Sequence, residues 1–64
     1  MNERYLRCPQ VRELTGLGRS TIYDKMKRNE FPHPRKLGAR AVAWPESAIR
    51  SWLESREFAE YSSA

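Results

Sequence analysis

The sequence has few of the residues that build cross-linked or metal-bound folds, because its 64 residues include one cysteine and one histidine. Cys8 alone cannot form an internal disulfide, and Cys8 with His33 is too small a set for a structural zinc site. No apolar run approaches the roughly 20 residues of a membrane span. The segment 1–5 also lacks the apolar stretch of a signal peptide. We therefore expect a cytoplasmic protein with no membrane contact, no metal and no other cofactor.

Catalytic constellations are missing as well. The chain contains no glycine-rich phosphate loop, and nothing in it places His33 as a base beside the Cys8 thiol. A domain of this length buries only about 60% of the surface that its unfolded chain exposes, which leaves little room for a deep cavity. We expect one non-enzymatic domain over residues 1–64, without a small-molecule ligand. Its ordered core should cover about residues 4–58, followed by a frayed tail over 59–64.

Positive charge is what the sequence has in surplus, with 12 Lys and Arg against 8 Asp and Glu. The surplus is concentrated in residues 19–40, which contain seven basic and two acidic residues. Residues 41–64 contain two basic and four acidic residues. A concentrated basic segment favours an acidic partner, with nucleic acid first. The alternative is that these charges only solvate exposed faces.

Two short helices separated by a glycine turn are predicted in the first half of the chain. Val11 and Leu14 share a helical face over residues 9–15, and Gly16 ends that helix. Ile22 and Met26 form a narrow apolar stripe in a second helix over residues 19–28. Helix, tight turn and helix is the pattern of a helix-turn-helix motif.

A hairpin and a third helix are predicted in the second half. Strand-compatible residues flank Gly38, which predicts a two-stranded wing over residues 35–44. Pro45 suits the first position of a helix, and the apolar stripe that follows predicts a third helix over residues 45–58. The members of that stripe are Ile49, Trp52, Leu53 and the stem of Arg56. The expected fold is mainly α with a small β-hairpin, a winged helix-turn-helix of three helices and a two-stranded wing.

Several aromatic residues and Cys8 have two possible roles. Trp44, Trp52 and Phe31 could stack on the bases of RNA or single-stranded DNA. We favour a place in the core, because a small domain needs large apolar anchors. Cys8 is expected to be a small buried hydrophobe.

The second helix carries residue types that read duplex DNA. Arginine can bind guanine through two hydrogen bonds, and serine and threonine adapt to several bases. Arg19 is basic at a helix N-terminus, where acids are favoured; a docked phosphate would explain this, or the side chain simply extends into water. Tyr23 is either a core residue or a phosphate contact through its hydroxyl. The candidate DNA-binding residues of this helix are Arg19, Ser20, Thr21, Tyr23, Lys25 and Arg28.

The wing and the C-terminal segment supply the remaining candidates. Arg40 lies at the wing tip, where an arginine can contact the DNA backbone or enter a narrow minor groove. Arg35 and Lys36 could neutralise phosphates, or they could only keep the hairpin edge soluble. Phe58 and Tyr61 form a weak second stripe at helical spacing, which makes them candidates for contact with a protein partner.

Together these residues resemble the AlpA family of prophage regulatory proteins, over about residues 4–56. The likeness rests on Val11, the run Thr15–Tyr23, Phe31-Pro32, Leu37-Gly38-Ala39-Arg40, Trp44 and Trp52. It implies a MerR-like winged helix-turn-helix fold, related in architecture to phage excisionases. Gly18 departs from the family's common serine, so the usual side-chain cap of the second helix is missing.

The resemblance implies a sequence-specific regulator of transcription that binds double-stranded DNA in the bacterial cytoplasm. Its targets would be the integrase or excision genes of a prophage or another mobile element. One alternative is an excisionase-like architectural protein that bends attachment-site DNA. Another is a protein-interaction module, such as an antitoxin or a recombinase adaptor. Besides DNA, the expected partners are a second copy, in a dimer or a cooperative array, and an integrase or recombinase.

Overall fold

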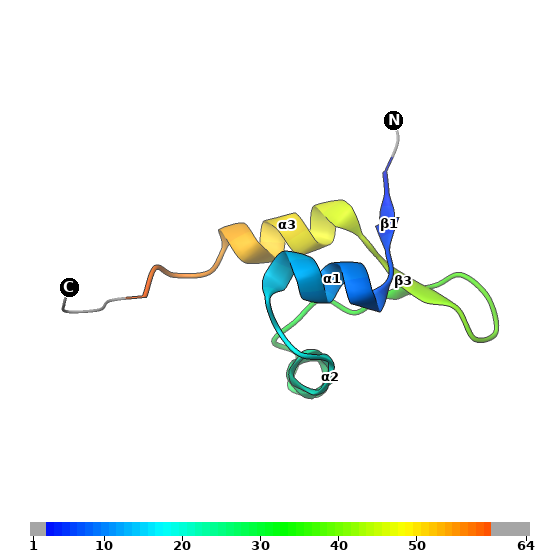
Figure 1. Ribbon diagram of the computed structural model, residues 1–64, viewed down its shortest axis with the longest axis horizontal. Coiled ribbons are helices and arrows are strands. Elements are labelled where there is room, and N and C mark those ends of the chain that lie inside the picture. Colours follow the sequence, from blue (N-terminus) through cyan, green and yellow to red (C-terminus); the bar gives the residue numbers. More distant parts are fainter. Residues whose placement is uncertain (1–2, 60–64) are drawn as a thin grey trace.

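Three helices and three short strands make up the computed structural model, which describes residues 3–59 (Figure 1). In chain order they are β1 (Tyr5–Leu6), α1 (Cys8–Thr15), α2 (Arg19–Lys27), β2 (Arg35–Lys36), β3 (Val42–Pro45) and α3 (Glu46–Glu54). The three predicted helices and the predicted hairpin are therefore present. The first two helices begin and end within one residue of the prediction. The last part of the expected tail, residues 60–64, lies outside the described residues.

The sheet has one more strand than the sequence predicted. Its order is β1-β3-β2, with antiparallel pairing on both sides of β3. Leu6 is opposite Trp44 in one pair, and Arg35 is opposite Ala43 in the other. A two-residue strand such as β1 is too short to show an alternating pattern in the sequence. It is held by pairing with β3 and by burial of Leu6.

The connection between α1 and α2 is short and internally bonded. Gly16 ends α1 in the left-handed conformation, with φ 76°, and its N–H donates to the Arg12 carbonyl at 2.8 Å. The Thr15 hydroxyl donates to the Val11 carbonyl at 2.8 Å and accepts the Leu17 N–H at 3.2 Å. These bonds hold the turn, so the predicted glycine end of α1 is confirmed.

One apolar cluster gathers residues from all three helices and from two strands. Its fully or nearly fully buried members are Leu6, Val11, Ile22, Phe31, Trp44 and Ile49. Trp44 has no exposed surface, and its indole N–H donates to the Pro32 carbonyl at 2.8 Å. The core role is thus confirmed for Trp44 and Phe31.

Trp52 lies at the margin of this cluster. Its ring centroid is 4.7 Å from that of Phe31, and the guanidinium carbon of Arg56 lies 4.6 Å from the indole centroid. The indole N–H donates to the Glu30 carbonyl at 2.9 Å. Trp52 is therefore half-buried and packed against the core, with a phenyl ring and an arginine as its neighbours.

The third helix begins within one residue of the prediction, but its predicted end is wrong. Pro45 is the last residue of β3, because its pairing with Tyr5 keeps it extended. The helix ends at Glu54 and not at residue 58. The Ser55 hydroxyl and the Arg56 Nε–H both donate to the Trp52 carbonyl, which satisfies the last turn. Phe58 follows in non-helical chain and is 98% exposed, with no apolar surface to cover.

Two residues of α1 are also less buried than predicted. Val11 is fully buried, whereas Leu14 is 38% exposed and Cys8 is half-buried. Cys8 lies three residues before Val11 and Thr15 lies four residues after it, and both are half-buried. The helix therefore faces the core along this line, and Leu14 lies at its margin.

The two residues directly before β1 bond to the start of α3. The Glu3 carboxylate accepts the Ser47 N–H at 3.1 Å and the Ser47 hydroxyl at 2.8 Å. The Arg4 carbonyl accepts the Glu46 N–H at 2.8 Å. The hydrogen bonds from the Ser47 backbone and side chain hold the pKa of Glu3 below its usual range. The N-terminal segment therefore caps a helix that lacks a side-chain cap from Pro45.

Candidate nucleic-acid interface

Helix α2 is attached to the fold along one narrow face. Ile22 is fully buried, and Tyr23 and Met26 are half-buried against the core cluster. The opposite face is exposed and polar, with Ser20, Thr21, Asp24, Lys27 and Arg28. Figure 1 views α2 along its axis, on the far side of α1 from α3. This face is free to meet another molecule.

The N-terminus of α2 has no side-chain cap. Gly18 is the capping residue, and its extended backbone has φ −79°. The first turn contains no acidic residue, and the first N–H groups of a helix have no partner within it. Arg19 adds a positive charge at this positive end of the helix dipole. The arrangement favours an anion at this end of α2.

Arg19 and Tyr23 lie together on the surface of α2. The Arg19 guanidinium carbon is 5.2 Å from the Tyr23 ring centroid, so the arginine rests on the ring and does not simply extend into water. The Tyr23 ring meets Trp44 edge-on, with centroids 6.5 Å apart. Tyr23 is thus half in the core. Its hydroxyl as a phosphate contact stays a prediction.

Two basic residues of α2 differ from what the sequence indicated. Lys25, a candidate DNA-binding residue, is half-buried, because it lies three residues after the buried Ile22. Lys27 was not singled out, yet it is exposed. It is seven residues after Ser20 and three after Asp24, so the helical spacing itself puts it on the polar face.

Arg28 makes the ion pairs of this face. Its guanidinium lies 3.5 Å from the Asp24 carboxylate and 3.8 Å from the Glu30 carboxylate. All three side chains are about half exposed or more. Exposed pairs of this kind contribute only about 0–1 kcal/mol each. Arg28 can therefore exchange these partners for a phosphate at little cost.

The hairpin presents the second basic surface. Arg35 and Lys36 are exposed in β2, and Arg40 is exposed in the loop that joins β2 to β3. Residues 31–45 contain no Asp or Glu. Figure 1 shows this loop projecting from the body of the fold. The two basic surfaces are connected by residues 28–34, which are anchored by buried Phe31 and by the bond from Trp44 to Pro32.

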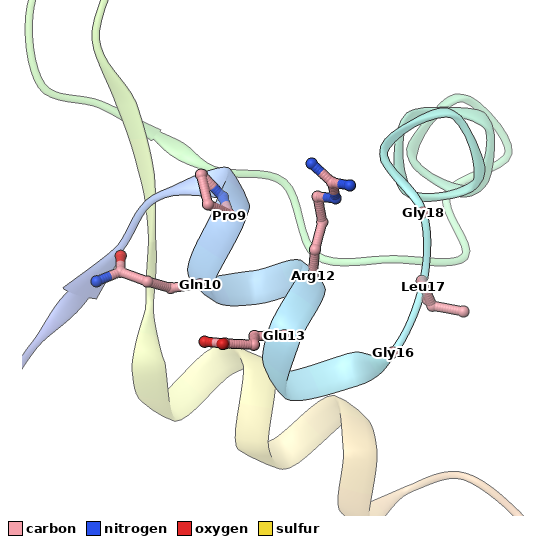
Figure 2. A pocket seen from close by; sticks show the side chains of 7 residues that line it. All are labelled: Pro9, Gln10, Arg12, Glu13, Gly16, Leu17 and Gly18. Atoms are coloured by element: carbon pink, nitrogen blue, oxygen red, sulfur yellow. The ribbon is translucent and has the colours of Figure 1, made fainter.

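A shallow hollow of about 520 Å³ lies where α1 turns into α2 (Figure 2). It is lined by Pro9, Gln10, Arg12, Glu13, Gly16, Leu17 and Gly18. In Figure 2 the Arg12 side chain lies between Pro9 and the start of α2, and Glu13 extends on another side of α1. The hollow is open to solvent, unlike the clefts that enclose most of a small-molecule ligand. Arg12 therefore adds a cation near the N-terminus of α2, a placement that no sequence pattern indicated.

The other expectations concern metals, membranes and the C-terminal segment. Within residues 3–59, no group of three or more His, Cys, Asp or Glu side chains is placed to hold a metal ion. No helix in that range is long and apolar enough to cross a membrane. Phe58 is exposed after the end of α3, and Tyr61 lies outside the described residues.

Comparison with known proteins finds relatives over most of the chain. Residues 4–57 match the family described as prophage CP4-57 regulatory protein (AlpA). The chain is 46% identical over 54 residues to the uncharacterized protein ORF88 of enterobacteria phage P4, an alignment that covers 84% of this chain and 61% of that protein. It is 44% identical over 59 residues to the DNA-binding transcriptional activator AlpA of Escherichia coli (strain K12), covering 83% of this chain and 84% of the relative. This chain therefore spans less than two thirds of the phage protein's length. No solved structure gives a significant match.

Proposed function

The chain belongs to the AlpA family of prophage regulatory proteins, and we propose that it is a sequence-specific DNA-binding regulator of transcription. The Escherichia coli relative carries the name of a DNA-binding transcriptional activator. In this proposal α1, the turn and α2 form a helix-turn-helix, and the β2–β3 hairpin is its wing. The observation that carries it is the exposed polar face of α2, whose N-terminus is basic and uncapped.

Helix α2 is proposed to enter the major groove of B-DNA. Its nine residues span about 14 Å, and the groove is about 12 Å wide. Arg19, Ser20 and Thr21 form the first turn, which contacts base edges in most helix-turn-helix complexes. Lys27 and Arg28 lie at the other end of the exposed face, where phosphates pass. Lys25 and Tyr23 are proposed to reach phosphates from the edge of the buried face.

The wing is proposed to contact the neighbouring backbone and minor groove. Arg35 and Lys36 are exposed along β2, and none of the wing's basic side chains makes an ion pair with any residue in the range 3–59. Arg40 in the loop suits a narrow minor groove, whose negative potential attracts arginine. The wing is therefore a source of both affinity and position along the duplex.

The regulated genes are proposed to be integrase or excision genes of a prophage or another mobile element, in the bacterial cytoplasm. A single module of this size buries only about 600–1,000 Å² of its surface on DNA. We therefore propose that a second copy binds at an adjacent site. The fully exposed Phe58, on a segment that also carries Glu54 and Glu57, is the proposed contact between copies. A recombinase is the alternative partner for the same segment.

The test begins with selection of duplexes from a pool with randomised positions, using the intact protein. Affinity is then measured for a selected duplex and for its scrambled version, at two salt concentrations. We expect a preference of about 10³-fold or more. The logarithm of the affinity should fall with the logarithm of salt concentration, by about 0.9 for each phosphate contact. Equal and weak binding to both duplexes contradicts the proposal.

The number of copies bound is measured on the selected duplex by sedimentation, with one site and with two adjacent sites. We expect cooperative binding of two copies, and a loss of the cooperativity in Phe58→Ala. The matched control is Glu57→Ala, which changes the neighbouring residue but retains the aromatic ring. Independent binding of single copies to every duplex contradicts the second-copy proposal.

A further inference from the structure

Leu37 is an exposed leucine at the point where β2 turns into the hairpin loop. Its side chain is 53% exposed. Lys36 precedes it, Arg40 lies three residues later, and the segment 31–45 contains no acidic residue. A large apolar side chain is therefore exposed within a segment whose charges are all positive.

Other exposed apolar residues have different surroundings. Leu14 is 38% exposed and lines a groove of mixed charge, which contains two glutamates and two arginines. Phe58 is 98% exposed and follows Glu57. A single exposed leucine needs no explanation in general. The positive electrostatic setting of Leu37, however, favours a polyanion and disfavours another basic surface.

The backbone of Leu37 is fixed to the core. Its N–H donates to the Ala41 carbonyl at 2.7 Å, and the Gly38 N–H donates to the same oxygen at 3.2 Å. Ala41 leads directly into β3, where Ala43 and Trp44 have no exposed surface. Placing Leu37 against a partner therefore costs little ordering of the chain.

We propose that Leu37 is a wedge that enters the minor groove of DNA and partly unstacks one base step, while Arg40 occupies the groove beside it. Apolar side chains inserted in this way kink a duplex by about 20–90°. The preferred step is a flexible pyrimidine–purine step such as TA or CA. This inference rests on the proposed DNA binding and assigns to the wing a role beyond phosphate contact: it bends the DNA and selects a deformable step.

The experiment uses the intact protein and the duplex recovered in the selection. Adenines in the flanking region are replaced one at a time by 2-aminopurine, whose fluorescence rises when the base is unstacked. Dyes at the two ends report the end-to-end distance. With the wild-type protein we expect a fluorescence rise at one step and a shorter end-to-end distance.

Three variants decide the outcome. Leu37→Ala should lose most of both signals and bind about tenfold more weakly, as expected for loss of a buried leucine contact. Leu37→Met should keep them, because it retains the length and the apolar character. Leu14→Ala is the matched control and should behave as wild type. Circular dichroism should show the same folded content in all four proteins.

Each contrary result overturns either the wedge or the proposed function. If wild type prefers the selected duplex but Leu37→Ala bends and unstacks it as wild type does, the wedge is wrong and the DNA-binding proposal stands. If the wild-type protein shows no sequence preference, the proposed function itself fails. If Leu37→Ala changes the sedimentation of the free protein, Leu37 is a contact between copies and the wedge is again wrong.

Discussion

Helices α2 and α3 are both nine residues long, and each buries one isoleucine completely. Their N-termini are built in opposite ways. Helix α3 begins with Glu46, receives a carboxylate from Glu3, and has the Glu46–Arg50 ion pair at 2.7 Å. Helix α2 begins with Gly18 and Arg19, with neither a side-chain cap nor an acidic residue in its first turn.

The two helix ends differ in whether their N–H groups and their dipole are satisfied within the protein. The start of α3 satisfies its N–H groups and its dipole within the protein. At the start of α2, no side chain caps the N–H groups and no acidic residue in the first turn offsets the dipole, although a serine cap would be simple to build. A helix end that departs from what stabilises an isolated domain is a functional signal. We expect α2 and α3 to be equally important for folding and unequal in binding.

The largest expected effect tests whether α2 and α3 are equally important for folding. Ile22→Ala and Ile49→Ala each remove a fully buried side chain. Both should lower the free energy of unfolding by about 2–5 kcal/mol. Denaturant unfolding followed by tryptophan fluorescence measures it. A loss under about 1 kcal/mol in either variant would show that its helix is not part of the same core.

The next effect separates the two helices in binding. Arg19→Ala should weaken binding to the selected duplex by about 1–3 kcal/mol, because it removes the proposed base contact. Its unfolding free energy should change by less than about 1 kcal/mol, because relief at the helix dipole offsets the lost contact with Tyr23. Arg50→Ala should leave binding unchanged and lose about 0.5 kcal/mol or less of stability. Equal losses of affinity in the two variants would remove the distinction.

A smaller effect concerns the missing cap. A Cβ added at Gly18 meets no atom within 4 Å, and the backbone there suits serine. Gly18→Ser should therefore raise stability by about 0.3–1 kcal/mol, in thermal or denaturant unfolding. Gly16→Ser is the matched control: with φ +76°, it should destabilise by about 1–2 kcal/mol. The idea of a missing cap fails if Gly18→Ser is no more stable than wild type.

The smallest effect is the pH dependence of the α3 cap. The pKa of Glu3 is lowered from its usual 4.5 in the folded protein. Its stabilisation should therefore be complete above pH about 4.5 and should disappear as pH falls through the lowered pKa. Wild type should exceed Glu3→Gln in stability at pH 7, and the two should converge in acid. Glu57→Gln provides a control in the exposed C-terminal segment. A stability difference that persists at pH 2 would contradict the cap.

How far the sequence predicts the structure depends on the range of the interaction. The helix over 19–28 and the hairpin were predicted, because spacing and breaker residues are local signals. The burial of Trp44 was predicted because a small domain needs large apolar anchors. The end of α3 was not. The predicted helix extended past Glu54 because the stem of Arg56 and a second, weaker stripe at Phe58 have helical spacing. Burial depends, however, on a surface for such a stripe to cover, and Phe58 is 98% exposed.

The candidate DNA-binding surface also contains residues that the sequence could predict and residues that depend on the fold. The basic character of residues 19–40 and the polar face of α2 could be read directly from residue types. Lys27 could have been found by its spacing from Ser20, whereas the half-burial of Lys25 depends on what packs beside α2. Arg12 required the fold, because only the turn at Gly16 brings α1 next to the start of α2.

The helices and the glycine turn could be predicted from residues a few positions apart, because they arise from local geometry. The basic middle of this chain could be predicted from its residue types alone. Strand β1, the cap on α3 and the arrangement of two basic surfaces required the folded chain. Glu3 and Ser47 are 44 residues apart, and no local pattern links a carboxylate to a helix end at that distance. The pairing of β1 with β3 brings them together.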